Sequence, residues 1–344
     1  MQKLYKAAVF IGRFQPVHKA HLKIIKTALS IAEKVIIVIG SSNEPRTPKN
    51  PWSFEERDRM IHNALDNSLS RQRVICVPSV NTKTNNQAWA VRVQESVAQH
   101  TNPTDNIVLI GHKKAGDAST FYLDMFPQWD FYDHPISTPA LDASDIRAVY
   151  FNPSKSAEFL SGVLDTETIR DLDAFKNTED YAYIVDEIRA ETEARKPYLS
   201  LPYPPIFSTA DAVVIQSGHV LMIKRRAAPG KGLWALPGGF VNANTDRSVE
   251  DAALRELEEE TKIKVPEKVL RGNIKGSYVF DSIDRSARGR TITHAFNIVL
   301  PDGPLPKVKG SDDAEKAFWV PIAALQRNVC FEDHYEIISH FVGG

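Results

Sequence analysis

The chain has 344 residues, of which 42% are hydrophobic and 25% charged; this composition is ordinary for a globular protein, and the length predicts about two domains. The formal net charge of −1 argues against binding to nucleic acid or to a membrane surface. We expect a cytoplasmic protein for three reasons. The chain has two cysteines, its start does not resemble a signal peptide, and it lacks a long apolar stretch. A homo-oligomer is compatible with the sequence.

The first half of the sequence alternates strand-like and helix-like segments. Short apolar runs predict strands at 7–12, 35–40, 74–78 and 106–111. Segments with helical spacing of apolar residues predict helices at 21–32, 54–65 and 87–99. The alternation is typical of an α/β domain with a doubly wound, Rossmann-like parallel sheet. Ligands of such domains bind beyond the carboxyl ends of the strands, so we expect the chemistry just after Ile11, Ile39 and Ile110.

The second half begins after a polar, charged stretch at 161–196 that we expect to be helical. Four prolines in the nine residues 197–205 predict an extended connector, because proline has a fixed φ and no N–H. Two strand-like runs, a glycine-rich loop, one long charged helix and further strand-like runs follow. We therefore expect a first domain at 1–196, a linker at 197–205 and an α+β domain at 206–344.

The first candidate site lies in 10–21 (FIGRFQPVHKAH), where the first strand is followed by the first helix. His18 and His21 are three residues apart at the start of this helix, so they face the same side. Free N–H groups at a helix N-terminus attract phosphate, and Arg13 and Lys19 add positive charge. The alternative interpretation is a pair of surface histidines at a helix cap.

This segment resembles the HxGH nucleotidyltransferases, with Ala20 in place of the family's glycine. Residues 50–57 (NPWSFEER), 86–89 (NQAW) and 144–147 (SDIR) follow in an order similar to the archaeal-type nicotinamide mononucleotide (NMN) adenylyltransferases. The resemblance covers about residues 4–155. It implies that the 5′-phosphate of NMN attacks the α-phosphorus of ATP and that diphosphate leaves. Such a reaction needs positioning and charge stabilisation rather than a protein nucleophile.

The resemblance also implies residue roles. The catalytic residues are then His18 and His21, which line the ATP phosphates, and Arg147, which neutralises them together with Arg13. The remaining residues expected to bind ATP or NMN are Gly12, Phe14, Lys19, Asn86, Trp89, His112 and Ser144.

Two of these residues are assigned to the nicotinamide group. Trp89 would stack on the cationic ring, a cation–π contact of ~1–2 kcal/mol, and Asn86 would hydrogen-bond the carboxamide. The alternative interpretation of Trp89 is an aromatic side chain of the core on a helix.

The second candidate site follows the loop at 233–241 (LWALPGGFV). Glu256, Glu259 and Glu260 stand at i, i+3 and i+4 of the long charged helix, so three carboxylates share one face. Like charges at this spacing repel each other, and hard divalent cations with oxygen ligands offset that repulsion. The alternative is a solvated acidic helix face.

This segment resembles the Nudix box, whose glutamates bind metal. Three positions depart from its pattern. Arg247 falls where the box has its first glutamate, Val241 where it has a glycine, and Lys262 where it has its last glycine. The metal-binding core is intact, so hydrolysis is expected, and the loop carboxylate is either missing or supplied by Asp246.

By this resemblance Glu256, Glu259 and Glu260 bind Mg²⁺, with Mn²⁺ as a substitute, and Glu259 and Glu260 are catalytic. The stretch 285–296 is similar to Nudix domains that handle ADP-ribose. The residues expected to bind ADP-ribose are Arg225, Gly238, Gly239, Phe240, Arg288 and Arg290. The sequence leaves the general base open.

Together the two halves resemble the bifunctional NMN adenylyltransferase/Nudix hydrolases. This implies synthesis of NAD and diphosphate from ATP and NMN, and Mg²⁺-dependent hydrolysis of ADP-ribose to AMP and ribose 5-phosphate. One alternative is an NAD synthase whose Nudix half is a nucleotide sensor or scaffold. A transcription regulator is disfavoured, because about 24 residues follow Val320 and the net charge is near zero.

Overall fold

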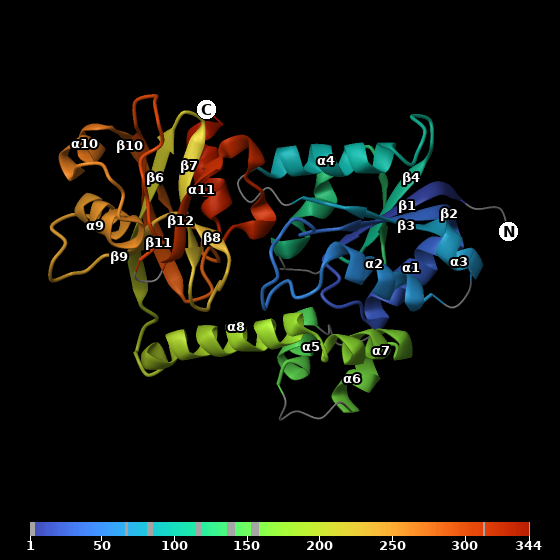
Figure 1. The fold of residues 1–344 in the computed structure, drawn as a ribbon. Helices are drawn as coiled ribbons and strands as arrows, with labels where there is room; N and C mark the ends of the chain where they lie inside the picture. Colours follow the sequence, from blue (N-terminus) through green and yellow to red (C-terminus); the bar gives the residue numbers. More distant parts are fainter. Residues whose placement is uncertain are drawn as a thin grey trace. The chain divides into compact units, whose positions relative to one another are not determined.

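The computed structural model divides the chain into two compact units, 1–185 and 186–344 (Figure 1). It describes residues 4–65, 68–80, 85–113, 118–135, 142–152, 158–311 and 314–343. The division falls inside helix α8 (Glu179–Arg195), before the boundary expected from the sequence. The physical reason is Glu187, whose buried carboxylate accepts hydrogen bonds from the N–H groups of Gly230 and Lys231 at 2.6 and 3.3 Å.

The first unit contains a five-stranded sheet in the order β3-β2-β1-β4-β5, and every neighbouring pair is parallel. Its strands are β1 (Tyr5–Gly12), β2 (Ala32–Ile39), β3 (Val74–Pro78), β4 (Ile107–Gly111) and β5 (Asp130–Asp133). The Rossmann-like parallel sheet predicted from the sequence is confirmed. The sequence did not reveal β5, because all four of its residues are exposed and give no apolar pattern.

Helices cover both faces of this sheet. They are α1 (Lys19–Ile31), α2 (Phe54–Asn63), α3 (Ser68–Arg73), α4 (Asn86–Ala98), α5 (Ala143–Tyr150), α6 (Glu158–Val163) and α7 (Thr166–Phe175), with a 3-10 segment η1 (Ala118–Met125). Side chains alternate along β1: Val9 packs with Val93 of α4, whereas Phe10 lies 6.1 Å from His21 of α1. Figure 1 accordingly shows α4 on one side of the sheet and α1 on the other.

The second unit is built on a mixed sheet of seven strands in the main order β10-β11-β6-β7-β12. Its strands are β6 (Ile206–Gln216), β7 (His219–Arg225), β8 (Trp234–Ala235), β9 (Gly238–Phe240), β10 (Ile274–Phe280), β11 (Arg290–Val299) and β12 (Ala314–Pro321). β6 and β11 are parallel, and the remaining pairs are antiparallel. The α+β class expected for this half is confirmed.

Two hydrophobic layers flank this sheet because side chains alternate along β6. Val214 packs with Leu257 of α9 (Val249–Thr261) on one face, and Val213 packs with Ile337 of α11 (His334–Val342) on the other. The remaining short elements are α10 (Glu267–Gly272), η3 (Ile322–Ala324) and η4 (Arg327–Val329).

The proline-rich segment 197–205 is not uniformly extended, so that expectation was wrong. Lys196–Tyr198 forms a 3-10 turn, η2, and turns and bends continue to residue 203. Pro197 stands in the first turn of η2, where a fixed φ fits helical geometry and the missing N–H leaves no bond unmade. Among the described helices, none is long and apolar enough to cross a membrane.

Helix α2 begins with a reciprocal pair of hydrogen bonds. The hydroxyl of Ser53 accepts from the N–H of Glu56 at 3.3 Å, and the Glu56 carboxylate accepts from the N–H of Ser53 at 2.7 Å. We expect Ser53→Ala to lower the free energy of unfolding by about 1 kcal/mol, measured by urea denaturation. The control Ser96→Ala, on the exposed side of α4, should change it by less than about 0.5 kcal/mol, and an equal loss in both variants would contradict the capping role.

Candidate active sites

The first candidate site begins where β1 ends and α1 starts. His18 is the N-cap residue of α1, but within the described part of the chain its side chain makes no capping hydrogen bond. Instead, the rings of His18 and His21 stack, with centroids 3.6 Å apart and an interplanar angle of 23°. The pair is therefore held by ring stacking, which is not the geometry of a simple helix cap.

Burial keeps both histidines uncharged. The ring of Phe14 lies 4.7 Å from that of His21, and His18 is only 7% exposed. Burial lowers the pKa of His18 to about 4, and burial and the neighbouring His18 lower the pKa of His21 well below its usual value. The Nδ1 atoms of both rings are buried and find no hydrogen-bond partner among the described residues. Two neutral rings with unused polar atoms are suited to hydrogen-bonding a ligand.

The turn before the histidines has a tightly fixed backbone. Phe14 adopts φ +54°, and a Cβ on Gly12 would approach the Phe14 ring to 3.0 Å. The side-chain amide of Gln15 donates to the carbonyl of Trp52 at 2.8 Å and accepts from its N–H at 3.0 Å. Gly12 is thus needed for the close approach of the phenyl ring, and Gln15 ties the turn to the segment that precedes α2.

Arg57 of α2 was not assigned to the site from the sequence. Its side chain is 1% exposed and donates to the carbonyls of Arg13 and Gly40 at 2.8 and 2.7 Å, just beyond the ends of β1 and β2. Burial and the charge of Arg13 lower the pKa of Arg57 to about 10, with Glu55 opposing the shift. Arg57 stands in a run of charged helical residues, so the neighbouring sequence did not indicate that its side chain is buried.

Arg147 of α5 completes a group of three guanidinium groups. It donates to the carbonyl of Gln15 at 2.7 Å and to the hydroxyl of Ser144 at 3.1 Å. Burial and the charge of Arg13 lower the pKa of Arg147 to about 10, with Asp142 opposing the shift. The structure therefore brings the predicted His18, His21, Arg13, Ser144 and Arg147 to the same end of the sheet.

Trp89 combines both interpretations given to it. Its Nε1–H donates to the Ser79 hydroxyl at 3.1 Å, and its ring meets those of Tyr122 and Phe126 edge-on at 6.1 and 5.9 Å. The side chain is nevertheless only partly buried, at the margin of the core. Asn86, the first residue of α4, is exposed.

Two other residues predicted to bind ATP or NMN contact the protein itself. The Lys19 ammonium donates to the carbonyls of Ser161 and Gly162 at 2.9 and 3.2 Å, beside α6. Nδ1 of His112, after β4, lies 3.4 Å from a carboxylate oxygen of Asp133. These contacts give both residues a structural role next to the site.

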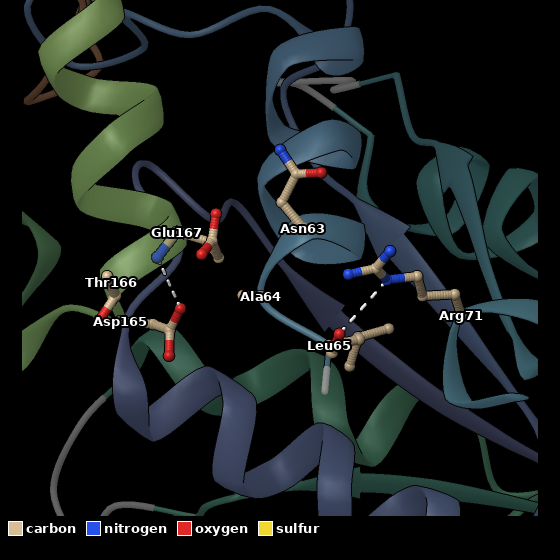
Figure 2. A pocket seen from close by; sticks show the side chains of 7 residues that line it. All are labelled: Asn63, Ala64, Leu65, Arg71, Asp165, Thr166 and Glu167. Atoms are coloured by element: carbon tan, nitrogen blue, oxygen red, sulfur yellow. Dashed lines mark hydrogen bonds between the residues drawn. The ribbon is translucent and has the colours of Figure 1, made fainter. Parts of the chain in front are cut away.

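A pocket of about 470 Å³ also lies in the first unit, near α2 and α7 (Figure 2). It is lined by Asn63, Ala64, Leu65, Arg71, Asp165, Thr166 and Glu167. The Arg71 guanidinium donates to the carbonyl of Leu65 at 3.3 Å, and Asp165 caps α7 through the N–H of Glu167. Its polar groups thus serve the fold, and none of the residues predicted for a site lines it.

The second candidate site is organised around Arg255 of α9. Its guanidinium donates to both carboxylate oxygens of Asp246 at 2.8 Å, to Glu256 at 2.8 Å and to Glu259 at 2.9 Å. The repulsion expected among the glutamates is therefore partly offset by an arginine. Asp246 brings a loop carboxylate against the same guanidinium group, which is compatible with the second of the two alternatives expected for the loop, a carboxylate supplied by Asp246.

Glycines bring the loop against the carboxylates. Glu260 is 5% exposed, accepts from the N–H of Gly238 at 3.0 Å, and burial raises its pKa to about 8. A Cβ on Gly239 would lie 2.5 Å from a carboxylate oxygen of Glu256, and one on Gly238 would lie 2.2 Å from Asp211. Burial also raises the pKa of Glu256. Buried carboxylates held this close together are a donor set that fits a hard divalent cation.

Beside these carboxylates, two arginines share one aromatic ring. The guanidinium of Arg225 lies 4.1 Å from the ring centroid of Phe331, and that of Arg288 lies 5.7 Å from it and 5.2 Å from Phe240. Phe331 was not anticipated, because no motif surrounds it and it lies far along the chain from both arginines. Both guanidinium groups thus lie within cation–π distance of the same ring, which favours the positive charge that they bring to this place.

A buried ion pair supports this cluster. Arg285 donates to both carboxylate oxygens of Asp333 at 3.0 and 2.8 Å, and the next residue, His334, accepts from the N–H of Leu236 at 2.9 Å. Burial and the charge of nearby arginines lower the pKa of His334 well below its usual value. In contrast, the guanidinium group of Arg290, which was predicted to bind ADP-ribose, donates to the backbone carbonyl of Asp281.

Comparison with known proteins assigns each unit to a family. Residues 9–149 match the cytidylyltransferase-like family and residues 206–341 match the NUDIX domain. A nicotinamide/nicotinic acid mononucleotide adenylyltransferase of Acinetobacter baylyi is 33% identical over 53% of this chain and 93% of its own. An ADP-ribose pyrophosphatase of Methanocaldococcus jannaschii is 34% identical over 43% of this chain and 78% of its own.

One solved structure matches both units together. It is a bifunctional NMN adenylyltransferase/ADP ribose pyrophosphatase from Francisella tularensis, complexed with AMP and a manganese ion. It is 35% identical, with a TM-score of 0.88, and the match covers 98% of this chain and 99% of that one. The resemblance predicted from the two motifs is confirmed, and the chain belongs to the family of bifunctional NMN adenylyltransferases/ADP-ribose pyrophosphatases.

Proposed function

We propose that this chain makes NAD and diphosphate from ATP and NMN in its first unit, and hydrolyses ADP-ribose to AMP and ribose 5-phosphate in its second. One observation carries the proposal: a single chain holds two separate groups of side chains suited to phosphate. The first joins a neutral histidine pair to arginines, and the second joins buried carboxylates to arginines.

In the first unit the residues act on phosphates by position and charge. The neutral rings of His18 and His21 offer N–H groups to phosphate oxygens, and Arg13 and Arg147 stabilise the negative charge that develops on the transferred group. The attacking group is the phosphate of NMN, so no side chain forms a bond to phosphorus. Trp89 and Asn86 are proposed to hold the nicotinamide ring and its carboxamide.

In the second unit Glu256, Glu259 and Glu260 would hold Mg²⁺ or Mn²⁺. The bound ion supplies positive charge that stabilises the oxyanions and lowers the pKa of an attacking water. Arg225 and Arg288, which both lie near the Phe331 ring, are proposed to bind the diphosphate oxygens of ADP-ribose. The manganese ion and AMP of the Francisella protein support a divalent cation and an adenylate product.

The histidine pair is tested by His21→Asn, which keeps a polar side chain but removes the stacked ring. We expect NAD synthesis to fall roughly 100- to 1,000-fold, because phosphate-directed hydrogen bonds are lost in the transition state. ADP-ribose hydrolysis by the same preparation should not change. The control His100→Asn, after α4, should leave both rates unchanged. Near-normal synthesis by His21→Asn would show that the pair has only a structural role.

The role of Trp89 is tested by Trp89→Ala against Trp129→Ala. Both tryptophans pack against the same core cluster, so both losses affect stability. Only Trp89→Ala should raise the KM for NMN, by about 5- to 30-fold, while the KM for ATP stays constant. A parallel rise of both KM values would instead identify Trp89 as a core residue.

The hydrolase assignment is tested by Glu259→Gln, which keeps the shape but removes one ligand charge. We expect the rate of ADP-ribose hydrolysis to fall by about 100-fold or more while NAD synthesis persists. The rate is measured by chromatography of the AMP formed. Glu258→Gln, on the exposed side of the same helix, is the matched control and should be active. If wild-type protein fails to cleave ADP-ribose with either Mg²⁺ or Mn²⁺, the second unit is a sensor or scaffold.

The raised pKa of Glu260 predicts how metal affinity depends on pH. Burial raises the pKa of Glu260 to about 8, so below that pH its carboxylate holds a proton that the cation must displace. The affinity for Mn²⁺, measured by electron paramagnetic resonance of the free ion, should therefore weaken by up to about tenfold per pH unit as the pH falls below 8. Glu260→Gln should bind more weakly and lose this dependence. An unchanged slope in that variant would contradict the assignment.

A further inference from the structure

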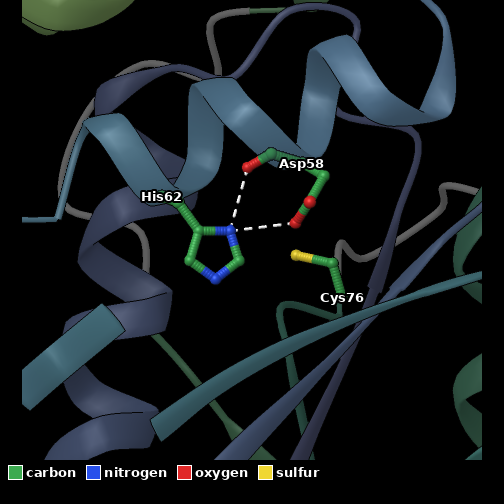
Figure 3. A group of neighbouring side chains, drawn as sticks. All are labelled: Asp58, His62 and Cys76. Carbon is green, nitrogen blue, oxygen red and sulfur yellow. Dashed lines mark hydrogen bonds and ion pairs between the residues drawn. The ribbon is translucent and has the colours of Figure 1, made fainter. Parts of the chain in front are cut away.

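Three side chains with different donor atoms meet where α2 packs near β3, outside both active sites. They are Asp58 and His62, one helical turn apart on α2, and Cys76 on β3 (Figure 3). One donor atom from each lies within 4.8 Å of the others. Figure 3 shows the Cys76 sulfur and the Asp58 carboxylate turned toward the same ring nitrogen of His62.

The His62 ring faces oxygen acceptors on both sides. Its Nε2 lies 3.2 Å from the carbonyl oxygen of Val74. Its Nδ1 lies 2.9 Å from Asp58 Oδ1 and 3.0 Å from the backbone oxygen of Asp58. A neutral imidazole carries one N–H, so it can donate to only one of these sides. If Val74 accepts Nε2–H, the Nδ1 lone pair of a neutral ring points at a carboxylate, and either a second proton or a metal ion between the two removes this repulsion.

The contact with Val74 also matches the outer shell of known metal sites. A histidine that binds metal through one nitrogen commonly donates its other N–H to a backbone carbonyl, which fixes the tautomer and the ring orientation. Val74 is near Cys76 on β3, so the strand that orients the ring also carries the third donor. Burial and a hydrogen bond to Asp58 raise the pKa of the Cys76 thiol, which therefore keeps its proton until a cation displaces it.

We propose that Asp58, His62 and Cys76 bind one zinc ion. Sulfur, nitrogen and oxygen donors together suit Zn²⁺ and do not suit Mg²⁺ or Ca²⁺, which take oxygen ligands. The side chains of Asp58 and His62 are 38% and 30% exposed, so water can fill the fourth tetrahedral position. Binding forms a bond from zinc to the Cys76 sulfur as the thiol proton leaves to solvent, and no electron is transferred.

The ion would act as a clamp between a helix and an edge strand. Among the described strands β3 has one neighbour, β2, so a bond from its middle residue to α2 adds a second attachment. The residue before Asp58 is Arg57, which holds the carbonyls of Arg13 and Gly40. Zinc at Asp58 would thus stabilise the helix that supports the first active site without touching its ligands.

The test uses the full-length protein, stripped of metal and kept in excess Mg²⁺ to occupy the carboxylates of the second unit. Titration with Co²⁺ should produce a thiolate-to-metal charge-transfer band that saturates at one equivalent of Co²⁺ per chain. Zn²⁺ added afterwards should displace Co²⁺ and remove the band. Cys76→Ser should lose this band. His62→Asn removes a ligand and should weaken Co²⁺ binding by roughly 10- to 100-fold or more, since loss of an outer-shell partner alone has an effect of that size. Zn²⁺ should raise the Tm of wild-type protein and not that of Cys76→Ser.

The matched control is Cys330→Ser, which removes a buried thiol of the second unit and should keep the band and the zinc-dependent rise in Tm. NAD synthesis by Cys76→Ser and His62→Asn, measured without zinc, reports whether each variant is folded. Absence of the band from wild-type protein overturns the proposal. So does a band that survives in Cys76→Ser, or one that Cys330→Ser abolishes, because each places the thiolate elsewhere.

Discussion

The first active site depends on one buried guanidinium group. Arg57 binds the carbonyls that follow β1 and β2 and the carbonyl of Ser53 at the start of α2. The carbonyl groups just beyond the strand ends of a parallel sheet receive no N–H from a neighbouring strand, and burying them without a donor costs about 1–3 kcal/mol each. By satisfying two strand ends from one side chain, Arg57 fixes the edge of the sheet from which the turn with the two histidines departs.

The second unit uses arginine for a different purpose. Arg255 stays partly exposed, and its hydrogen bonds within the described part of the chain go to carboxylates and to one backbone oxygen, so it spaces acidic groups rather than satisfying a strand end. Asp246 occupies two of its donors and leaves the others to Glu256 and Glu259. This distribution holds two carboxylates side by side before any cation arrives. Preorganisation of this kind lowers the cost of binding a metal.

The sequence predicted those parts whose signal is local. β3 was predicted at the residues it occupies, and the family of each unit was predicted from motifs, because strand patterning and phosphate loops are set by neighbouring residues. The exposed strand β10, by contrast, has no alternating apolar pattern and was missed. The division into compact units falls inside α8, before the expected boundary, and the contacts of Glu187 that accompany it join residues far apart in the chain.

The same distinction applies to the site residues. The sequence identified the residues that stand in motifs, namely His18, His21, Glu256, Glu259 and Glu260. The sequence did not reveal Phe331 or the burial of Arg57, because each depends on packing between distant segments. Their roles follow only from the folded chain, whereas the roles assigned from motifs stay predictions until the variants are measured.

The low pKa of the stacked histidines has a consequence for the conditions under which NAD can be made. Phosphate binding in many enzymes relies on imidazolium, whose charge disappears as the surroundings become alkaline and grows as they become acidic. Here the rings remain neutral down to a pH of about 4 for His18, and the positive charge comes from arginines that keep it through the neutral range. From a pH of about 4 through the neutral range, His18 and Arg147 therefore each keep one charge state, and the positive charge that faces a phosphate group at this site comes from guanidinium groups and not from imidazolium.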